Sequence, residues 1–217
     1  MPAILRKELT LSASILAYLF ILFALMFFIP GYPILCGAFF VTLGIFQSFQ
    51  TAREANDLVF SVLLPIAKRD VVRGRYLFVC LIEGAAGILM ALIVLLRMTL
   101  FSQSSVYRGN AMMNANLFAL GAAFVIFALF NLIFVGGFFR TGHQLGRPFV
   151  IYIIVVFPVI LAAEVLHHIP GCEMLNAFGT DALALQLGLF ALGLVIFLSV
   201  SILACRRACR HFEKIDL

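Results

Sequence analysis

The chain has 217 residues, of which 64% are hydrophobic and 12% charged, and its formal net charge is +5. Soluble domains hold roughly 45–50% apolar and about 25% charged residues. The composition therefore excludes an ordinary soluble enzyme, a disordered chain, a collagen and a disulfide scaffold. Six membrane crossings use about 120 residues, so residues 1–217 are expected to form a single transmembrane domain.

Six continuously apolar stretches predict an all-α integral membrane protein with six transmembrane helices. The stretches lack the alternation of barrel strands, which excludes a transmembrane β-barrel. Each stretch ends at charged residues or at Pro and Gly. In chain order they run from Leu11 to Ile29, Tyr32 to Phe49, Tyr76 to Leu96, Leu117 to Phe139, Phe149 to Leu166 and Ala182 to Ala204.

The amino-terminal segment precedes a first apolar stretch that is too long for a signal-peptide core and lacks a small-residue cleavage box. We expect this stretch to stay in the protein. Residues 1–11 are expected to form a short amphipathic helix along the cytoplasmic interface, with Ile4 and Leu5 against lipid.

Basic residues set the expected orientation, because cytoplasmic loops retain Lys and Arg. With the amino terminus inside, 13 of the 15 Lys and Arg residues are cytoplasmic, and only Arg97 and Arg108 lie outside. An even number of spans places the carboxyl terminus inside too, with residues 205–217 as a short cytoplasmic tail. The positive net charge is thus explained by the orientation of the chain in the plasma membrane, and we expect no nucleic-acid partner.

Catalytic motifs are absent from the sequence, which predicts that the chain is not an enzyme. Glu164, His167 and His168 form a weak metal candidate at the end of the fifth span, although a plain helix end explains them better. Residues 137–143 hold two glycines but lack the Lys-Ser/Thr pair of a phosphate loop, so we expect no nucleotide site. The sequence leaves open whether Cys36 and Cys172, both near the outer face, form a disulfide.

A few polar residues inside the spans are costly in lipid and are expected to face the protein interior. One interpretation is structural, with hydrogen bonds between helices or a pair between Glu83 and either Arg53 or Arg75. The other interpretation is a role in substrate passage or gating. The residues concerned are Gln47, Gln50, Glu83 and Asn131.

The inner loop from Gln50 to Arg75 is polar at its start and apolar in its second half. It predicts two to three turns of interfacial helix, with Leu58 and Val62 on one stripe and Pro65 ending or kinking the helix. Such a helix is either a membrane anchor or a docking surface for a cytoplasmic partner.

The same loop resembles the signature of ABC-2 type permeases. The resemblance rests on residues 57–72, DLVFSVLLPIAKRDVV, followed by Gly74-Arg75-Tyr76-Leu77. It is similar in particular to permeases that export phenol-soluble modulins and other small antimicrobial peptides. Ala67, where Ser or Thr is common, and Gly74 depart from the pattern.

The resemblance implies a permease subunit of an ATP-binding-cassette exporter that moves an amphipathic or hydrophobic cargo out of the cell. It implies two permeases, identical or homologous, and a separately encoded ATPase that binds ATP and Mg²⁺, while this chain binds no cofactor. The loop would then be a coupling helix that fits the ATPase. Its implied residues are Arg53, Glu54, Asp57, Leu58, Val62, Leu63, Pro65, Lys68, Arg69 and Asp70.

Two other functions stay open at this point. One is a non-transporting membrane subunit that acts in immunity, sensing or assembly, and the other is a membrane-embedded enzyme. A neighbouring gene for a stand-alone ATPase would favour the permease, and polar residues converging at one membrane depth would favour the enzyme.

Overall fold

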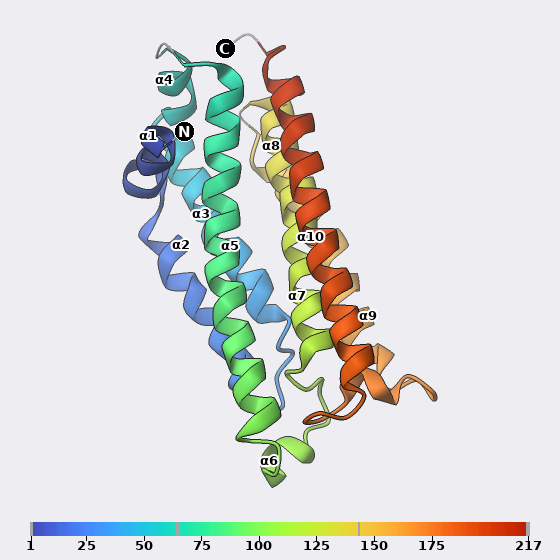
Figure 1. Ribbon diagram of the computed structural model, residues 1–217. Helices are drawn as coiled ribbons and strands as arrows, with labels where there is room; N and C mark the ends of the chain where they lie inside the picture. Colours follow the sequence, from blue (N-terminus) through green and yellow to red (C-terminus); the bar gives the residue numbers. More distant parts are fainter. Residues whose placement is uncertain (1, 64–65, 143, 216–217) are drawn as a thin grey trace.

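The computed structural model describes residues 2–63, 66–142 and 144–215, and shows a bundle of long helices that run side by side (Figure 1). No strand occurs among these residues. The two termini and helix α4 (Asp57–Leu63) lie at one end of the bundle, and α6 (Ser105–Arg108) lies at the other. The fold is therefore all-helical, as the sequence predicts.

The amino-terminal segment is helical and sharply bent. Helix α1 (Pro2–Lys7) continues as the π-helix η1 (Glu8–Ser12), and the axis turns by 94° before α2 (Ile15–Leu19) and the 3₁₀-helix η2 (Phe20–Phe28). Ile4 packs on Gly74 and Leu5 packs on the hydrophobic core, while both side chains are partly exposed, so their contact with lipid stays a prediction. The segment is thus fastened to the bundle.

Helix α3 (Cys36–Glu54) packs closely on the preceding segment. A Cβ added at Gly44 would lie 2.5 Å from the Cβ of Phe20, and one at Gly37 would lie 2.6 Å from the carbonyl oxygen of Phe23. Small residues that let helix backbones approach in this way are typical of membrane bundles. The helix ends at Glu54, and two residues later Asn56 has a φ of 52°, in the left-handed region that Asn tolerates.

The second half of the chain holds the longest helices. These are α5 (Lys68–Thr99), α7 (Leu117–Leu129), which continues through the π-helix η3 (Phe130–Val135) into α8 (Gly136–Thr141), α9 (Gly146–Leu166) and α10 (Leu183–Phe212). A short 3₁₀-helix, η4 (Glu173–Asn176), precedes α10. Helices α7 and α10 touch at Gly121 and Gly193, where an added Cβ on Gly193 would lie 2.7 Å from the Gly121 Cα.

Four helices in the described part of the chain are long and apolar enough to cross a membrane. They are α5, α7 with η3 and α8, α9 and α10, and the bent pair that begins at Ile4 makes a fifth if it is one span. Helix α3 falls short, since Gln47, Gln50 and Arg53 interrupt its second half. Its length of 19 residues suits a crossing, and the count of six spans stays a prediction.

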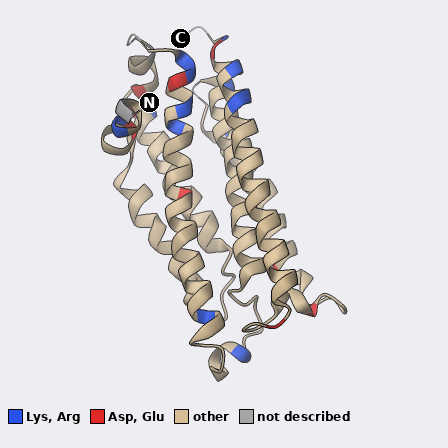
Figure 2. Ribbon diagram, viewed as in Figure 1, with Lys and Arg blue, Asp and Glu red and all other residues tan. Residues whose placement is uncertain are grey.

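Charged residues gather at the ends of the bundle (Figure 2). The end that holds α1, α4, the start of α5 and the end of α10 carries most of the Lys and Arg residues, which matches the predicted asymmetry. Arg97, in the last turn of α5, and Arg108, in α6, lie at the opposite end. We call the first end the basic end; its cytoplasmic location stays a prediction.

Cysteine pairing, which the sequence left open, is not formed. Cys36 and Cys172 are both free thiols, as are the three other cysteines.

Candidate functional site

Helix α4 has an inner and an outer face, because residues four apart lie on the same side of a helix. On the outer face Val59 is 45% exposed, Phe60 68% and Leu63 78%. On the inner face Leu58 packs against the hydrophobic core and Ser61 is buried. An apolar surface therefore stands out from the basic end of the bundle; we call Val59, Phe60 and Leu63 the α4 outer face.

The stripe that the sequence predicts cannot be followed to Val62, and Leu58, its described member, lies on the inner face. Leu58 borders a small pocket of about 80 Å³, beside Phe49 and Arg75, and Val59 lines the edge of the same pocket. Leu63, another residue of the predicted coupling set, is exposed. The side chain of Val62 and all of Pro65 fall outside the described residues. Phe60, which the sequence analysis did not single out, is the largest side chain of the outer face.

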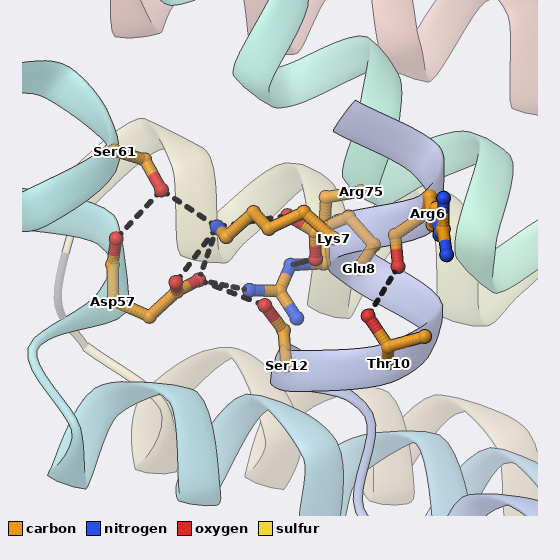
Figure 3. A network of polar contacts seen from close by, with 8 residues as sticks. All are labelled: Arg6, Lys7, Glu8, Thr10, Ser12, Asp57, Ser61 and Arg75. Atoms are coloured by element: carbon orange, nitrogen blue, oxygen red, sulfur yellow. Dashed lines mark hydrogen bonds and ion pairs between the residues drawn. The ribbon is translucent and has the colours of Figure 1, made fainter. Parts of the chain in front are cut away.

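A network of charged residues holds the inner face of α4 in place (Figure 3). Lys7 Nζ lies 2.7 Å from Asp57 Oδ1, and Arg75 Nη2 donates to Asp57 Oδ2 at 3.0 Å. Ser12 Oγ also donates to Asp57 Oδ2, at 3.1 Å. The carboxylate of Asp57, the first residue of α4, thus receives donors from α1, η1 and α5.

Two further residues complete the network. Glu8 Oε2 lies 2.9 Å from Arg75 Nε, and Lys7 Nζ donates to Ser61 Oγ at 2.6 Å. Glu8 is 1% exposed and Arg75 is 5% exposed. Buried charges are strongly destabilising unless they are paired, and here two cations meet two carboxylates. We call Lys7, Glu8, Asp57 and Arg75 the charge network.

The charge network fixes α4 to the amino-terminal segment (α1 and η1) and to α5. Lys7 and Asp57 are 50 positions apart in the sequence, and the bend after η1 is what brings them together. Gly74 makes room for this approach, since a Cβ there would collide with the Ile4 side chain. Helix α4 is therefore in direct contact with the amino-terminal segment and with α5. The departure at Gly74 noted in the sequence thus has a steric cause.

The remaining residues of the predicted coupling set lie on either side of α4. Arg53 and Glu54 are exposed in the last turn of α3. Lys68, Arg69 and Asp70 form the first turn of α5, where two of them bind the carboxy-terminal end of the chain. Lys68 Nζ donates to the Ile215 carbonyl at 2.6 Å, and Arg69 Nε lies 2.6 Å from Glu213 Oε1.

A second polar cluster lies deep in the bundle. Asn131 Nδ2 donates to Glu83 Oε2 at 2.8 Å and to Ser201 Oγ at 3.0 Å. Glu83 and Asn131 are fully buried. Asn131 sits in the π-helix η3, a local widening that is frequent at functional sites. The cluster joins α5, η3 and α10.

Neither of the arginines expected to pair with Glu83 does so. Arg75 binds Glu8 and Asp57, and in the described part of the chain no hydrogen bond links Glu83 to Gln47, Gln50 or Arg53. Of the intramembrane residues singled out from the sequence, the structure therefore brings together Glu83 and Asn131 only.

The weak metal candidate does not form a three-ligand site. Glu164 Oε2 accepts a hydrogen bond from the Met113 amide at 3.1 Å, and the His167 and His168 rings lie with their centroids 4.0 Å apart. Burial lowers the pKa of the His167 imidazole below its ordinary value. Among the residues described, no three His, Cys, Asp or Glu side chains are grouped so that they could hold a metal ion.

Comparison with known proteins identifies the family. A family model described as "ABC-2 family transporter protein" matches residues 3–207, which include α1, the charge network, α4 and most of α10. No curated protein and no solved structure matches the chain. Because the family model covers nearly the whole sequence, the chain belongs to the ABC-2 family of membrane transporter proteins.

Proposed function

We propose that this chain is the permease subunit of an ATP-binding-cassette exporter and that the α4 outer face docks on a separately encoded ATPase. The observation that carries the proposal is an exposed apolar surface of three neighbouring side chains at the basic end, on a helix whose other face is fixed by partly buried ion pairs. A helix that served only as an anchor at the membrane interface would not need ion pairs that fix its inner face.

The charge network supplies the mechanical link in this proposal. The ATPase moves α4, and Asp57 passes the displacement to η1 and α5 as a rigid-body shift. Eight residues separate Arg75 from Glu83 on α5, which is about 12 Å along a helix. The shift then reaches Asn131 and Ser201, and so α10. Glu83 acts in gating because the hydrogen bonds of Asn131 to Glu83 and Ser201 join the helices that must move.

The partners follow from the same proposal. Two permeases, identical or homologous, assemble with the ATPase in the plasma membrane, and ATP and Mg²⁺ bind to the ATPase alone. The cargo is amphipathic or hydrophobic, such as a small antimicrobial peptide. This chain is not an enzyme, and its resemblance to permeases for phenol-soluble modulins and similar peptides supports the cargo class.

The test is co-purification of the permease with a co-expressed candidate ATPase from the same organism. Burial of Phe60 and Leu63 would contribute roughly 1.5–3 kcal/mol for each side chain. The double variant Phe60→Asp/Leu63→Asp should therefore weaken ATPase binding by at least about 100-fold and abolish export. Membrane insertion should stay normal, since both side chains are exposed.

The matched control is Val106→Asp, a change at an apolar residue that is 63% exposed at the opposite end of the bundle. This variant should bind the ATPase as the wild type does. Full ATPase binding and full export by the Phe60→Asp/Leu63→Asp variant would show that α4 is not the docking element.

A further inference from the structure

A groove of about 480 Å³ opens on the surface between α8, α9 and α10, at the basic end. Its volume is in the range of small-ligand sites. One half is apolar and includes Leu132, Ile133 and Ile151, and the other half is polar. The polar half is lined by Arg140, Thr141, Gln144, Arg147, Arg207 and His211.

The turn between α8 and α9 sets the positions of two of these arginines. Helix α8 ends at Gly142, whose φ of +75° suits glycine and whose amide donates to the Phe138 carbonyl at 2.8 Å. Arg140 therefore lies in the last turn of α8 and Arg147 in the first turn of α9. Arg207 reaches the same groove from α10, so three guanidinium groups come from three helices.

Among the residues that the structure describes, the positive charge of the groove has no counter-charge. No ion pair or hydrogen bond joins the side chains of Arg140, Arg147 or Arg207 to any residue within the described ranges, and the groove lining holds no Asp or Glu. Elsewhere at this end, Arg69 and Arg75 are both paired with carboxylates. Three cations that face one groove without a counter-charge favour an anionic ligand.

We propose that the groove binds the phosphate headgroup of an anionic phospholipid, with an acyl chain along its apolar half. Arginine presents a fork of donors that matches phosphate geometry. Basic pockets between transmembrane helices at the cytoplasmic side suit such headgroups. A free phosphate ion would use the arginines alone, whereas a lipid also covers the exposed side chains of Leu132 and Ile151.

The experiment measures lipid binding to the purified full-length chain in detergent, by native mass spectrometry with added phosphatidylglycerol or phosphatidylcholine. The wild type should retain phosphatidylglycerol preferentially. Arg147→Gln/Arg207→Gln should weaken phosphatidylglycerol binding by roughly 30-fold. The control Arg206→Gln/Arg210→Gln removes the same charge from the same end of α10, outside the groove, and should bind as the wild type does.

Two further measurements separate the lipid from other occupants. Inorganic phosphate in excess should not displace the bound lipid, and Ile151→Ser should weaken lipid binding while the chain keeps its helical circular dichroism. Equal retention of the two lipids, equal losses in both arginine variants, or displacement by inorganic phosphate would overturn the proposal. So would dissociation of a dimer into monomers by Arg147→Gln/Arg207→Gln, because the groove would then be an interface between copies.

Discussion

The charge network makes a quantitative prediction for Asp57→Asn. The amide keeps the size of the side chain but removes one of two negative charges that face Lys7 and Arg75. Arg75 is only 5% exposed, so the excess positive charge that remains is poorly hydrated. Removal of one partner of a buried ion pair costs about 3–5 kcal/mol. Because the Asp57 side chain is 17% exposed, we expect a loss near the lower limit, about 3 kcal/mol of unfolding free energy.

The assay is the unfolding equilibrium of the purified chain in detergent or bicelles. Asp70→Asn is the matched control, because the Asp70–Arg73 pair at 3.3 Å is solvent-exposed on both sides. An exposed pair contributes about 0–1 kcal/mol. The double variant Lys7→Met/Asp57→Asn restores neutrality and should recover part of the loss. Equal costs for Asp57→Asn and Asp70→Asn, or strictly additive costs in the double variant, would refute the account of a buried network.

Three other predictions concern the packing of the bundle and its orientation in the membrane. Gly193→Ala should lower the unfolding free energy by about 1–3 kcal/mol, because the added Cβ meets the backbone of Gly121. Gly188 is on the same helix with open space around it, so Gly188→Ala should leave the unfolding free energy unchanged or raise it. Glu83→Leu should cost about 1–2 kcal/mol through the lost hydrogen bond to Asn131, and Glu83→Gln should cost less, in the same measurement. In a cysteine-free background, Ser104→Cys should react with a membrane-impermeant maleimide from outside intact cells, and labelling only after lysis would reverse the predicted orientation.

Much of the helical bundle can be predicted from the sequence, because a long apolar run has few stable conformations other than a transmembrane helix. The predicted span from Tyr76 to Leu96 lies within α5, and the one from Phe149 to Leu166 lies within α9. Apolar runs do not show where a helix continues past the hydrophobic segment. Helix α10 extends to Phe212, eight residues beyond the predicted end at Ala204.

The candidate site was less accessible to sequence reasoning, for two physical reasons. The rotation of a seven-residue helix about its own axis is set by its anchors, here the left-handed Asn56 and the bonds of Asp57. That rotation turns Phe60 outward and Leu58 inward. The pairing of Glu8 with Arg75 also depends on the 94° bend, which no local sequence pattern predicts. The one available signal was a carboxylate at Glu8, next to Arg6 and Lys7, just before the first apolar stretch.

The contacts of Lys68 and Arg69 with the last described turn of the chain have a practical consequence for affinity tags. A tag attached after residue 217 starts two residues past Ile215, at most about 7 Å of extended chain from the carbonyl that Lys68 binds. Its bulk would stand beside the first turn of α5, at the same end of the molecule as the α4 outer face. If such a fusion protein bound an ATPase weakly, the cause would be steric hindrance by the tag. A short epitope inserted between Ser102 and Ser104, at the far end of the bundle, would leave that surface open.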